Sequence, residues 1–425
     1  MRREKHRKLY LVCCIVLAGA SVCRAGQTDQ IELIATKVDQ FGTPEAGATR
    51  EPMIVEHPDG TLFVAGYGSP DFPNNLQKVP RLWRSSDHGN TWNLVNVGTE
   101  SDGAIGNSDV SLAMAPDGTL YFATMIFDAK TFEGVQITIG VSHDIGKTWR
   151  WKTLSKKRFD DRPWVAVAPD GAAHVIWNDG SGVYHSVSRD RGSHWSDPQR
   201  IHSAGGSSHL AIGPKGEIAV RIVPISASGN KFDEGVDLIA VSTDGGLTWE
   251  ERPVPGHRDW APTGTDGVTP RWVEPLAWDT HDALYNLSTS IKGVWLYRSE
   301  DLGLHWRTWK IADVEELSYY PYLTVSKSGE IAATWFSGAG ANLRWQACRV
   351  QVSEGGEFSI LSSPLLTTDS WGVADTHGNR PVRETAGEYL AALFLRDGTL
   401  SVVTPIQNPA LKQYGFSFWT FQTNK

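Results

Sequence analysis

Short runs of alternating apolar and polar residues, joined in pairs by tight turns, recur along this chain. Around Pro58-Asp59-Gly60, such runs cover Met53 to Val55 before the turn and Leu62 to Val64 after it. Alternation with a period of two is typical of half-buried strands, and proline and glycine favour tight turns, so the pattern predicts a β-hairpin. Turns at corresponding places are Pro116–Gly118, Pro169–Gly171, Pro214–Gly216, Asp279–Asp282, Lys327–Gly329 and Thr385–Gly387.

An octapeptide of the form Ser-x-Asp-x-Gly-x-Thr-Trp lies between these hairpins and occurs five times. Its copies are Ser85–Trp92, Ser142–Trp149, Ser188–Trp195, Ser242–Trp249 and Ser299–Trp306, with histidine in place of threonine in the third and fifth. The aspartate can accept hydrogen bonds from amides of its own turn, the glycine permits a positive φ, and the tryptophan has apolar area to bury. We therefore predict that the octapeptide is a structural turn.

Counting hairpins gives seven units, which begin near residues 50, 107, 160, 207, 270, 319 and 379. The last unit has no octapeptide after Arg396-Asp397-Gly398, so its outer strand has to come from Ile31–Lys37 or from Phe416–Phe421. Borrowing a strand in this way closes a ring and removes exposed sheet edges. We predict an all-β fold, a single β-propeller of four-stranded antiparallel blades with seven blades, or six as the alternative. No linker-like stretch interrupts residues 30–425.

Composition agrees with a globular β protein and argues against nucleic acid as a partner. The chain has 425 residues, 40% hydrophobic and 21% charged, with 18 Trp and 42 Gly. Its formal charge is −8, whereas a nucleic-acid surface needs excess positive charge. No Cys/His cluster with metal-ligand spacing is present, and we expect neither a metal nor a cofactor.

The first 25 residues have the layout of a secretory signal peptide. A basic stretch, Met1 to Lys8, precedes the apolar run Leu9 to Val22, and small residues follow at Ala25 and Gly26. The apolar run is short for a membrane span, although a retained N-terminal anchor is the alternative. Cleavage would leave residues 26–425 as one domain with a formal charge of −13 and Cys348 as its only cysteine. We expect a secreted or periplasmic protein of a bacterial envelope, with no membrane span in the mature chain.

The octapeptide resembles the Asp-box, or BNR repeat, of the sialidase-like β-propellers. In that family the repeat lies in the turn between the third and fourth strands of a blade, remote from the active site. The resemblance therefore implies that the five aspartates are structural.

The predicted first strands of the blades begin with unusually polar residues. Arg50, Arg162, Arg271 and Arg380 stand at the starts of blades 1, 3, 5 and 7. Arginine at a strand start is commonly solvated or salt-bridged. Several guanidinium groups around one pocket would instead select an anionic ligand, because each can bind a carboxylate with two hydrogen bonds. These arginines, together with His209 at the start of blade 4, are our candidate substrate-binding residues.

The resemblance also implies a catalytic set. Sialidases hold the substrate carboxylate with three arginines, the first in a Phe-Arg-Ile-Pro-like motif; here Thr49-Arg50-Glu51-Pro52 stands in that place, with Glu51 as a departure. Asp71 lies in the loop that carries the family's acid/base aspartate. The family's nucleophile is a tyrosine activated by a glutamate, for which Tyr320, or Tyr322, and Glu274 are the candidates. We expect Arg50, Arg271 and Arg380 to converge at one mouth of the channel, with Tyr320 and Glu274 within reach.

Three functions follow from these residues. The first is a secreted sialidase-like glycoside hydrolase that acts on a terminal acidic sugar of a glycan. The second is a polysaccharide lyase or another propeller glycosidase that uses His and Tyr, for which His209 and His377 are candidates. The third is a non-catalytic propeller that binds a glycan or a protein. Trp164, Trp272 and Trp371 could stack on sugar rings, although packing between blades is their usual role.

Overall fold

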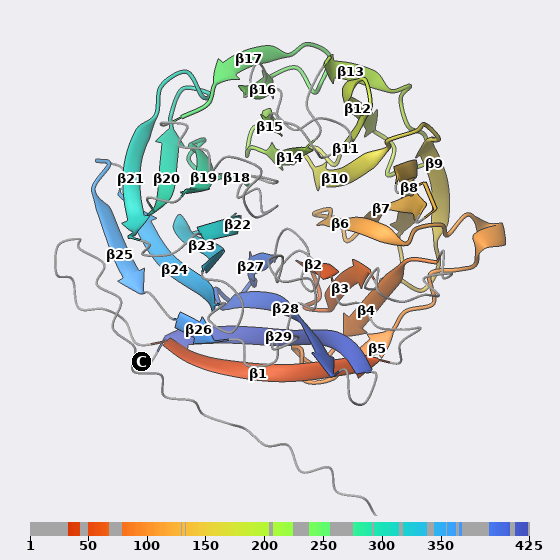
Figure 1. The fold of residues 1–425 in the computed structure, drawn as a ribbon, viewed down its shortest axis with the longest axis horizontal. Coiled ribbons are helices and arrows are strands. Elements are labelled where there is room, and N and C mark those ends of the chain that lie inside the picture. The colour runs from red at the N-terminus through yellow and green to blue at the C-terminus, as the bar shows by residue number, and fades with distance from the viewer. Residues whose placement is uncertain are drawn as a thin grey trace, which may run out of the picture.

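Seven antiparallel sheets stand around a common axis and form a closed ring (Figure 1). In this computed structural model the described residues are 33–42, 50–67, 79–128, 130–131, 133–203, 207–223, 238–255, 275–290, 293–313, 318–337, 344–353, 355–362, 365–367, 391–408 and 413–423. The helix they contain is the short 3₁₀ helix Glu100–Asp102. The chain is therefore an all-β, seven-bladed propeller, as the hairpin count predicts; the alternative of six blades is wrong.

Each blade has four strands in sequence order from the axis outward, except where the ring closes. Blades 1 to 3 comprise β2 (Arg50–Glu56), β3 (Leu62–Tyr67), β4 (Arg81–Ser85) and β5 (Asn93–Leu94); β6 (Ser108–Met114), β7 (Leu120–Asp128), β8 (Glu133–Ser142) and β9 (Arg150–Ser155); and β10 (Asp161–Val167), β11 (Ala173–Asp179), β12 (Gly182–Ser188) and β13 (Gln199–His202). Blades 4 and 5 comprise β14 (Ser207–Ile212), β15 (Ile218–Val223), β16 (Leu238–Ser242) and β17 (Glu250–Pro253); and β18 (Leu276–Trp278), β19 (Leu284–Ser290), β20 (Gly293–Ser299) and β21 (Arg307–Ala312). Blade 6 comprises β22 (Ser318–Val325), β23 (Glu330–Ser337), β24 (Arg344–Val352) and β25 (Phe358–Ser362), and β26 (Leu365–Thr367) also pairs with β24.

Blade 7 closes the ring with strands from both ends of the chain. From the axis outward it contains β27 (Ala392–Phe394), β28 (Leu400–Asn408), β29 (Gln413–Thr423) and β1 (Leu33–Gly42). Both candidate closing segments are thus used, one as the third strand and one as the fourth. The expected start near residue 379 is wrong for this blade, because Arg396-Asp397-Gly398 forms the inner turn between β27 and β28. The predicted turn Thr385–Gly387 lies outside the described residues.

The octapeptide joins the third and fourth strands in blades 1 to 5, and side-chain hydrogen bonds hold its turn. In the second copy, Asp144 Oδ1 accepts hydrogen bonds from the amides of Lys147 and Thr148, at 3.1 and 2.8 Å. Its Oδ2 accepts one from the Thr148 hydroxyl at 2.6 Å, and Ser142 Oγ accepts one from the Gly146 amide at 2.9 Å. These bonds satisfy amides that the strand ladder leaves without partners, so the five aspartates have structural roles.

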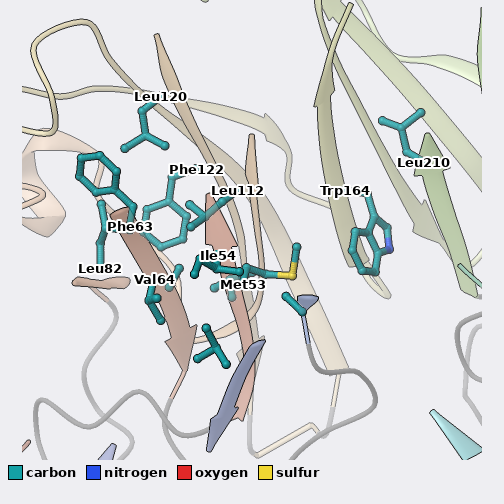
Figure 2. Close-up of a cluster of buried hydrophobic side chains, with 14 of the residues drawn as sticks. Met53, Ile54, Phe63, Val64, Leu82, Leu112, Leu120, Phe122, Trp164 and Leu210 are labelled. Atoms are coloured by element: carbon teal, nitrogen blue, oxygen red, sulfur yellow. The ribbon is translucent and has the colours of Figure 1, made fainter. Parts of the chain in front are cut away.

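Packing between blades is the main source of the core. Phe63 of blade 1 faces Leu120 and Phe122 of blade 2, and all three side chains are buried (Figure 2). In blades 1 to 5 the octapeptide glycine lies against the preceding blade: a Cβ on Gly192 would be 2.6 Å from Val141, and one on Gly246 would be 2.3 Å from His185. The turns therefore fix how neighbouring blades pack.

Candidate functional site

The two faces of the ring differ in what they carry. Since strands alternate in direction within a blade, the inner hairpin turns and the octapeptides lie on one face, which we call the turn face. The inner strands begin on the opposite face, which we call the site face. The starts of β2 and β10, which carry Arg50 and Arg162, therefore belong to the site face, away from the octapeptides.

The inner strands can be aligned through their turns, each of which begins with the same backbone hydrogen bond, such as His57 N–H to Thr61 O and Gly213 N–H to Glu217 O. The residue four positions before this turn occupies an equivalent level in every blade. We call these residues the inner ring: Met53, Ser111, Trp164, His209, Pro275, Tyr322 and Ala391. All are buried except Tyr322, which is partly exposed. The inner ring therefore forms a packed layer of side chains around the axis.

His209 contacts three other blades within this layer. Its Nδ1 accepts a hydrogen bond from the Leu276 amide of blade 5 at 3.2 Å. Its ring lies 4.5 Å from the Trp164 ring of blade 3 and 6.3 Å from the Tyr322 ring of blade 6, measured between centroids. Burial lowers the pKa of His209 to about 3, so the imidazole is neutral near pH 7.

The contact between His209 and Leu276 has an equivalent in another blade. At the same level, the Ser111 hydroxyl of blade 2 accepts a hydrogen bond from the Val165 amide of blade 3 at 3.1 Å. Val165 and Leu276 are each three positions before their own turn. One nitrogen of His209 thus links adjacent blades, which removes that nitrogen from use as a base.

Above the inner ring, blades 1 and 3 each have a bulge at the same position of the inner strand, and each bulge contains a charged residue. Glu51 and Pro52 oppose one residue of β3, and Arg162 and Pro163 oppose one residue of β11. Glu51 and Arg162 have φ values of 47° and 50°, which side chains other than glycine rarely adopt. Both are buried, at 2% and 8% exposure. Such strain is often found at functional sites, and bulges redirect side chains there.

The two candidate arginines that the structure describes, Arg50 and Arg162, have different surroundings. The guanidinium carbon of Arg50 lies 5.5 Å from the centre of the Tyr67 ring, a cation–π contact. Arg162 Nη1 donates to Asp161 Oδ2 at 2.7 Å. Arg162 is thus held by the carboxylate of its own neighbour in the sequence, which is the structural alternative stated for these arginines.

Asp160, which no sequence pattern singles out, is fully buried beside this pair. Its carboxylate accepts hydrogen bonds from the Ser155 hydroxyl and the Lys157 amide, both at 2.8 Å. Burial raises its pKa to about 6, against the effect of these bonds. Because Asp160 has no exposed surface, we assign it to holding the strand start rather than to contacting a ligand.

The remaining predicted site residues lie outside the described residues, except for the backbone of Tyr320. Asp71, Arg271, Glu274 and Arg380 lie outside the described residues, as do His377, Trp272 and Trp371. Tyr320 belongs to β22, at the bulge position equivalent to Glu51 and Arg162, but its side chain is outside the description. The reason for placing Arg380 at an inner strand start no longer holds, because β27 begins at Ala392. The expected convergence of Arg50, Arg271 and Arg380 stays a prediction.

Neither a metal site nor a membrane helix is found in the part of the chain that the structure describes. No group of three or more His, Cys, Asp or Glu side chains in these residues is arranged to hold a metal ion. No helix among the same residues is long and apolar enough to cross a membrane.

Comparison with solved structures finds other propellers at low sequence identity. An α-L-arabinanase of Penicillium chrysogenum is 17% identical, with a TM-score of 0.46 over 77% of this chain and 97% of that chain. A Hadza microbial sialidase is 16% identical, with a TM-score of 0.45 over 69% and 65%. An ulvan lyase is 12% identical, with a TM-score of 0.49 over 86% and 93%.

No protein-family model and no curated protein matches this sequence. The function therefore has to be inferred from this chain's own residues.

Proposed function

We propose that this protein is a secreted glycoside hydrolase of the sialidase type, which removes a terminal acidic sugar from a glycan at the site face. The observation that carries the proposal is the position of Arg50 and Arg162, beside and within equivalent bulges of two blades, directly above the largely buried inner ring. Guanidinium groups near a surface of low polarity favour an anionic ligand, since the field of a charge is screened less there. The formal charge of −8 gives no general attraction for anions, so these local groups have to supply it.

The catalytic roles follow the resemblance to the sialidases. Asp71 is the acid/base residue, Tyr320 is the nucleophile, and Glu274 activates it; Arg50, Arg162, Arg271 and Arg380 bind the carboxylate. Chain connectivity supports these roles for Asp71 and Glu274, because β3 ends and β18 begins on the site face. In such a mechanism the tyrosine forms a covalent glycosyl intermediate, which water then hydrolyses.

A polysaccharide lyase that uses His and Tyr is the second candidate, favoured by the proximity of His209 and Tyr322 across blades. The contacts of these two residues argue against His209 as the base, because its Nδ1 accepts the Leu276 amide and its pKa is low. Burial also raises the pKa of Tyr322, which keeps its hydroxyl protonated. A lyase would therefore need a base from elsewhere on the site face.

The deciding experiment is a product assay with the purified chain from residue 26 onward. Sialyllactose is followed by release of free sialic acid, and uronate polysaccharides by ultraviolet absorbance of unsaturated products. Release of sialic acid supports the hydrolase, and unsaturated products support the lyase. Binding without any product would show a non-catalytic module, and no binding of either acidic glycan would refute the proposal.

Arg50→Lys tests the carboxylate contact, because it keeps the charge and removes the two-pronged donor. Loss of one interaction with a charged group costs about 1.5–3 kcal/mol, so kcat/KM should fall about tenfold or more. Arg189→Lys is the matched control: this exposed arginine lies in an octapeptide on the turn face and donates to Gly245 O. Equal losses in the two variants would contradict the assignment of the site face.

A further inference from the structure

Trp164, His209 and Tyr322 bring three blades together in the inner ring. Tyr322 lies two blades away from His209, yet their rings are 6.3 Å apart and nearly perpendicular, at 87°. The short inner strand of blade 5, β18, begins only at Leu276. Blade 5 contributes the buried Pro275 at this level, between the blades of His209 and Tyr322.

The hydrogen bond to Leu276 sets the tautomer of His209. A neutral imidazole carries one proton, and a ring nitrogen that accepts a hydrogen bond cannot hold it. Since Nδ1 accepts the Leu276 amide, the proton is on Nε2, which is a donor. Among the described residues Nε2 has no hydrogen-bond partner, although the side chain is only 6% exposed.

Tyr322 resembles His209 in having a polar group without a partner among the residues that the structure describes. It is the partly exposed member of an otherwise buried layer, and its ring packs against the hydrophobic core. Its hydroxyl is protonated at neutral pH, as an ordinary phenol is, and burial raises the pKa of Tyr322 further. His209 and Tyr322 therefore provide two uncharged donors next to each other at the axis.

We propose that His209 and Tyr322 form the floor of the ligand site, where each donates a hydrogen bond to a hydroxyl or ring oxygen of the bound sugar, while Trp164 holds the His209 ring in place. This deepens the proposed function and rests on it for the ligand class, a glycan. The two residues determine specificity and take no proton during the reaction. The floor thus recognises the uncharged part of the sugar, and the arginines recognise its carboxylate.

His209→Asn and Tyr322→Phe test this floor. The Asn side-chain oxygen can replace Nδ1 as acceptor for Leu276, so the link between blades is kept while the Nε2 donor is lost. Tyr322→Phe removes only the hydroxyl. Ser111→Ala is the matched control, because it removes the equivalent link in blade 2 without touching the floor. Calorimetry measures the affinity of each variant for sialyllactose, for a glucuronic acid oligosaccharide and for lactose.

Each floor variant should bind every glycan that the wild type binds about three- to tenfold more weakly, as expected for one lost hydrogen bond. KM should rise with kcat nearly unchanged, and the pH profile of kcat should keep its shape. Ser111→Ala should lower the melting temperature and leave affinity unchanged. A fall in kcat of more than about a hundredfold in Tyr322→Phe, with affinity kept, would make Tyr322 a chemical participant and overturn the floor.

Unchanged affinity in both floor variants overturns the inference and leaves the proposed function intact. Binding of lactose but of neither acidic glycan refutes the proposed function, and the floor is then judged on lactose alone. A wild-type protein that binds none of the three glycans refutes both.

Discussion

Gly246→Ala is expected to destabilise the propeller by acting on the contact between blades 3 and 4. Gly246 has a φ of +87°, and a Cβ there would lie 2.3 Å from Cε1 of His185. Carbon atoms in favourable contact are about 3.5–4.0 Å apart, so one of the two groups has to move. His185 cannot do so easily: it is 2% exposed, its Nε2 is 2.9 Å from Nδ1 of His174, and its ring meets Trp249 edge-on at 5.4 Å.

The expected loss has two parts, and a second glycine of the same blade separates them. A side chain in the left-handed region costs about 1–2 kcal/mol, and overpacking a buried contact costs about 1–3 kcal/mol. Gly216 has a φ of +91°, and a methyl group added to it would meet nothing within 4 Å, so Gly216→Ala should show only the first part. Gly246→Ala should therefore lower the free energy of unfolding by about 2–5 kcal/mol in total.

Equilibrium unfolding in urea, followed by tryptophan fluorescence, measures both variants under the same conditions. His185→Ala removes the clashing ring, so the loss in the double variant with Gly246→Ala should be smaller than the sum of the single losses. Equal losses for Gly246→Ala and Gly216→Ala, or strictly additive losses in the double variant, would refute the argument that the octapeptide glycine sets the contact between blades.

Three further outcomes follow from the structure and the sequence. Asp144→Ala should lower the melting temperature, because two amides and two hydroxyls lose their acceptor at a cost of about 1–3 kcal/mol. The folded fraction should keep its activity, and a stable but inactive variant would contradict the structural role of the octapeptide. Burial lowers the pKa values of His174 and His185 to about 4 and about 3, so below about pH 6.5 the unfolded state binds protons that the folded state does not. Stability should therefore fall as the pH drops from 6.5 towards 4. The melting temperature of the double variant His174→Gln/His185→Gln should depend less on pH than that of the wild type, and an equal dependence would contradict this. The exported protein should begin close to Gly26 and carry Cys348 as its single thiol, which is buried; N-terminal sequencing, and mass before and after alkylation in denaturant, check both points.

The sequence alone was sufficient for the repeating parts of this fold, because the chemistry that defines them is local. The Asp144 turn is closed by residues within four positions of it, and the hairpin around Pro58-Asp59-Gly60 needs only a positive φ at Gly60 and alternating strands beside it. Counting such local signals predicted the number of blades. It misplaced the start of blade 7 near residue 379, whereas the inner strand begins at Ala392. Of the two predicted closing segments, the pairing of β1 with β29 decides which is outermost, and there Thr36 meets Thr420 across 384 positions of the chain.

The environment of His209 in the candidate site depended on a contact that no local pattern contains. The sequence marked Arg50, Arg162 and His209 by their places at strand starts, and their residue types suggested anion binding and base chemistry. Asp161, the partner of Arg162, is its neighbour in the sequence, whereas only the folded ring provided the amide of Leu276 to His209. That second contact crosses a blade boundary, and it decides which nitrogen of His209 holds a proton. Blade geometry was thus encoded in short segments, whereas the chemistry at the axis was set by how seven of them close into a ring.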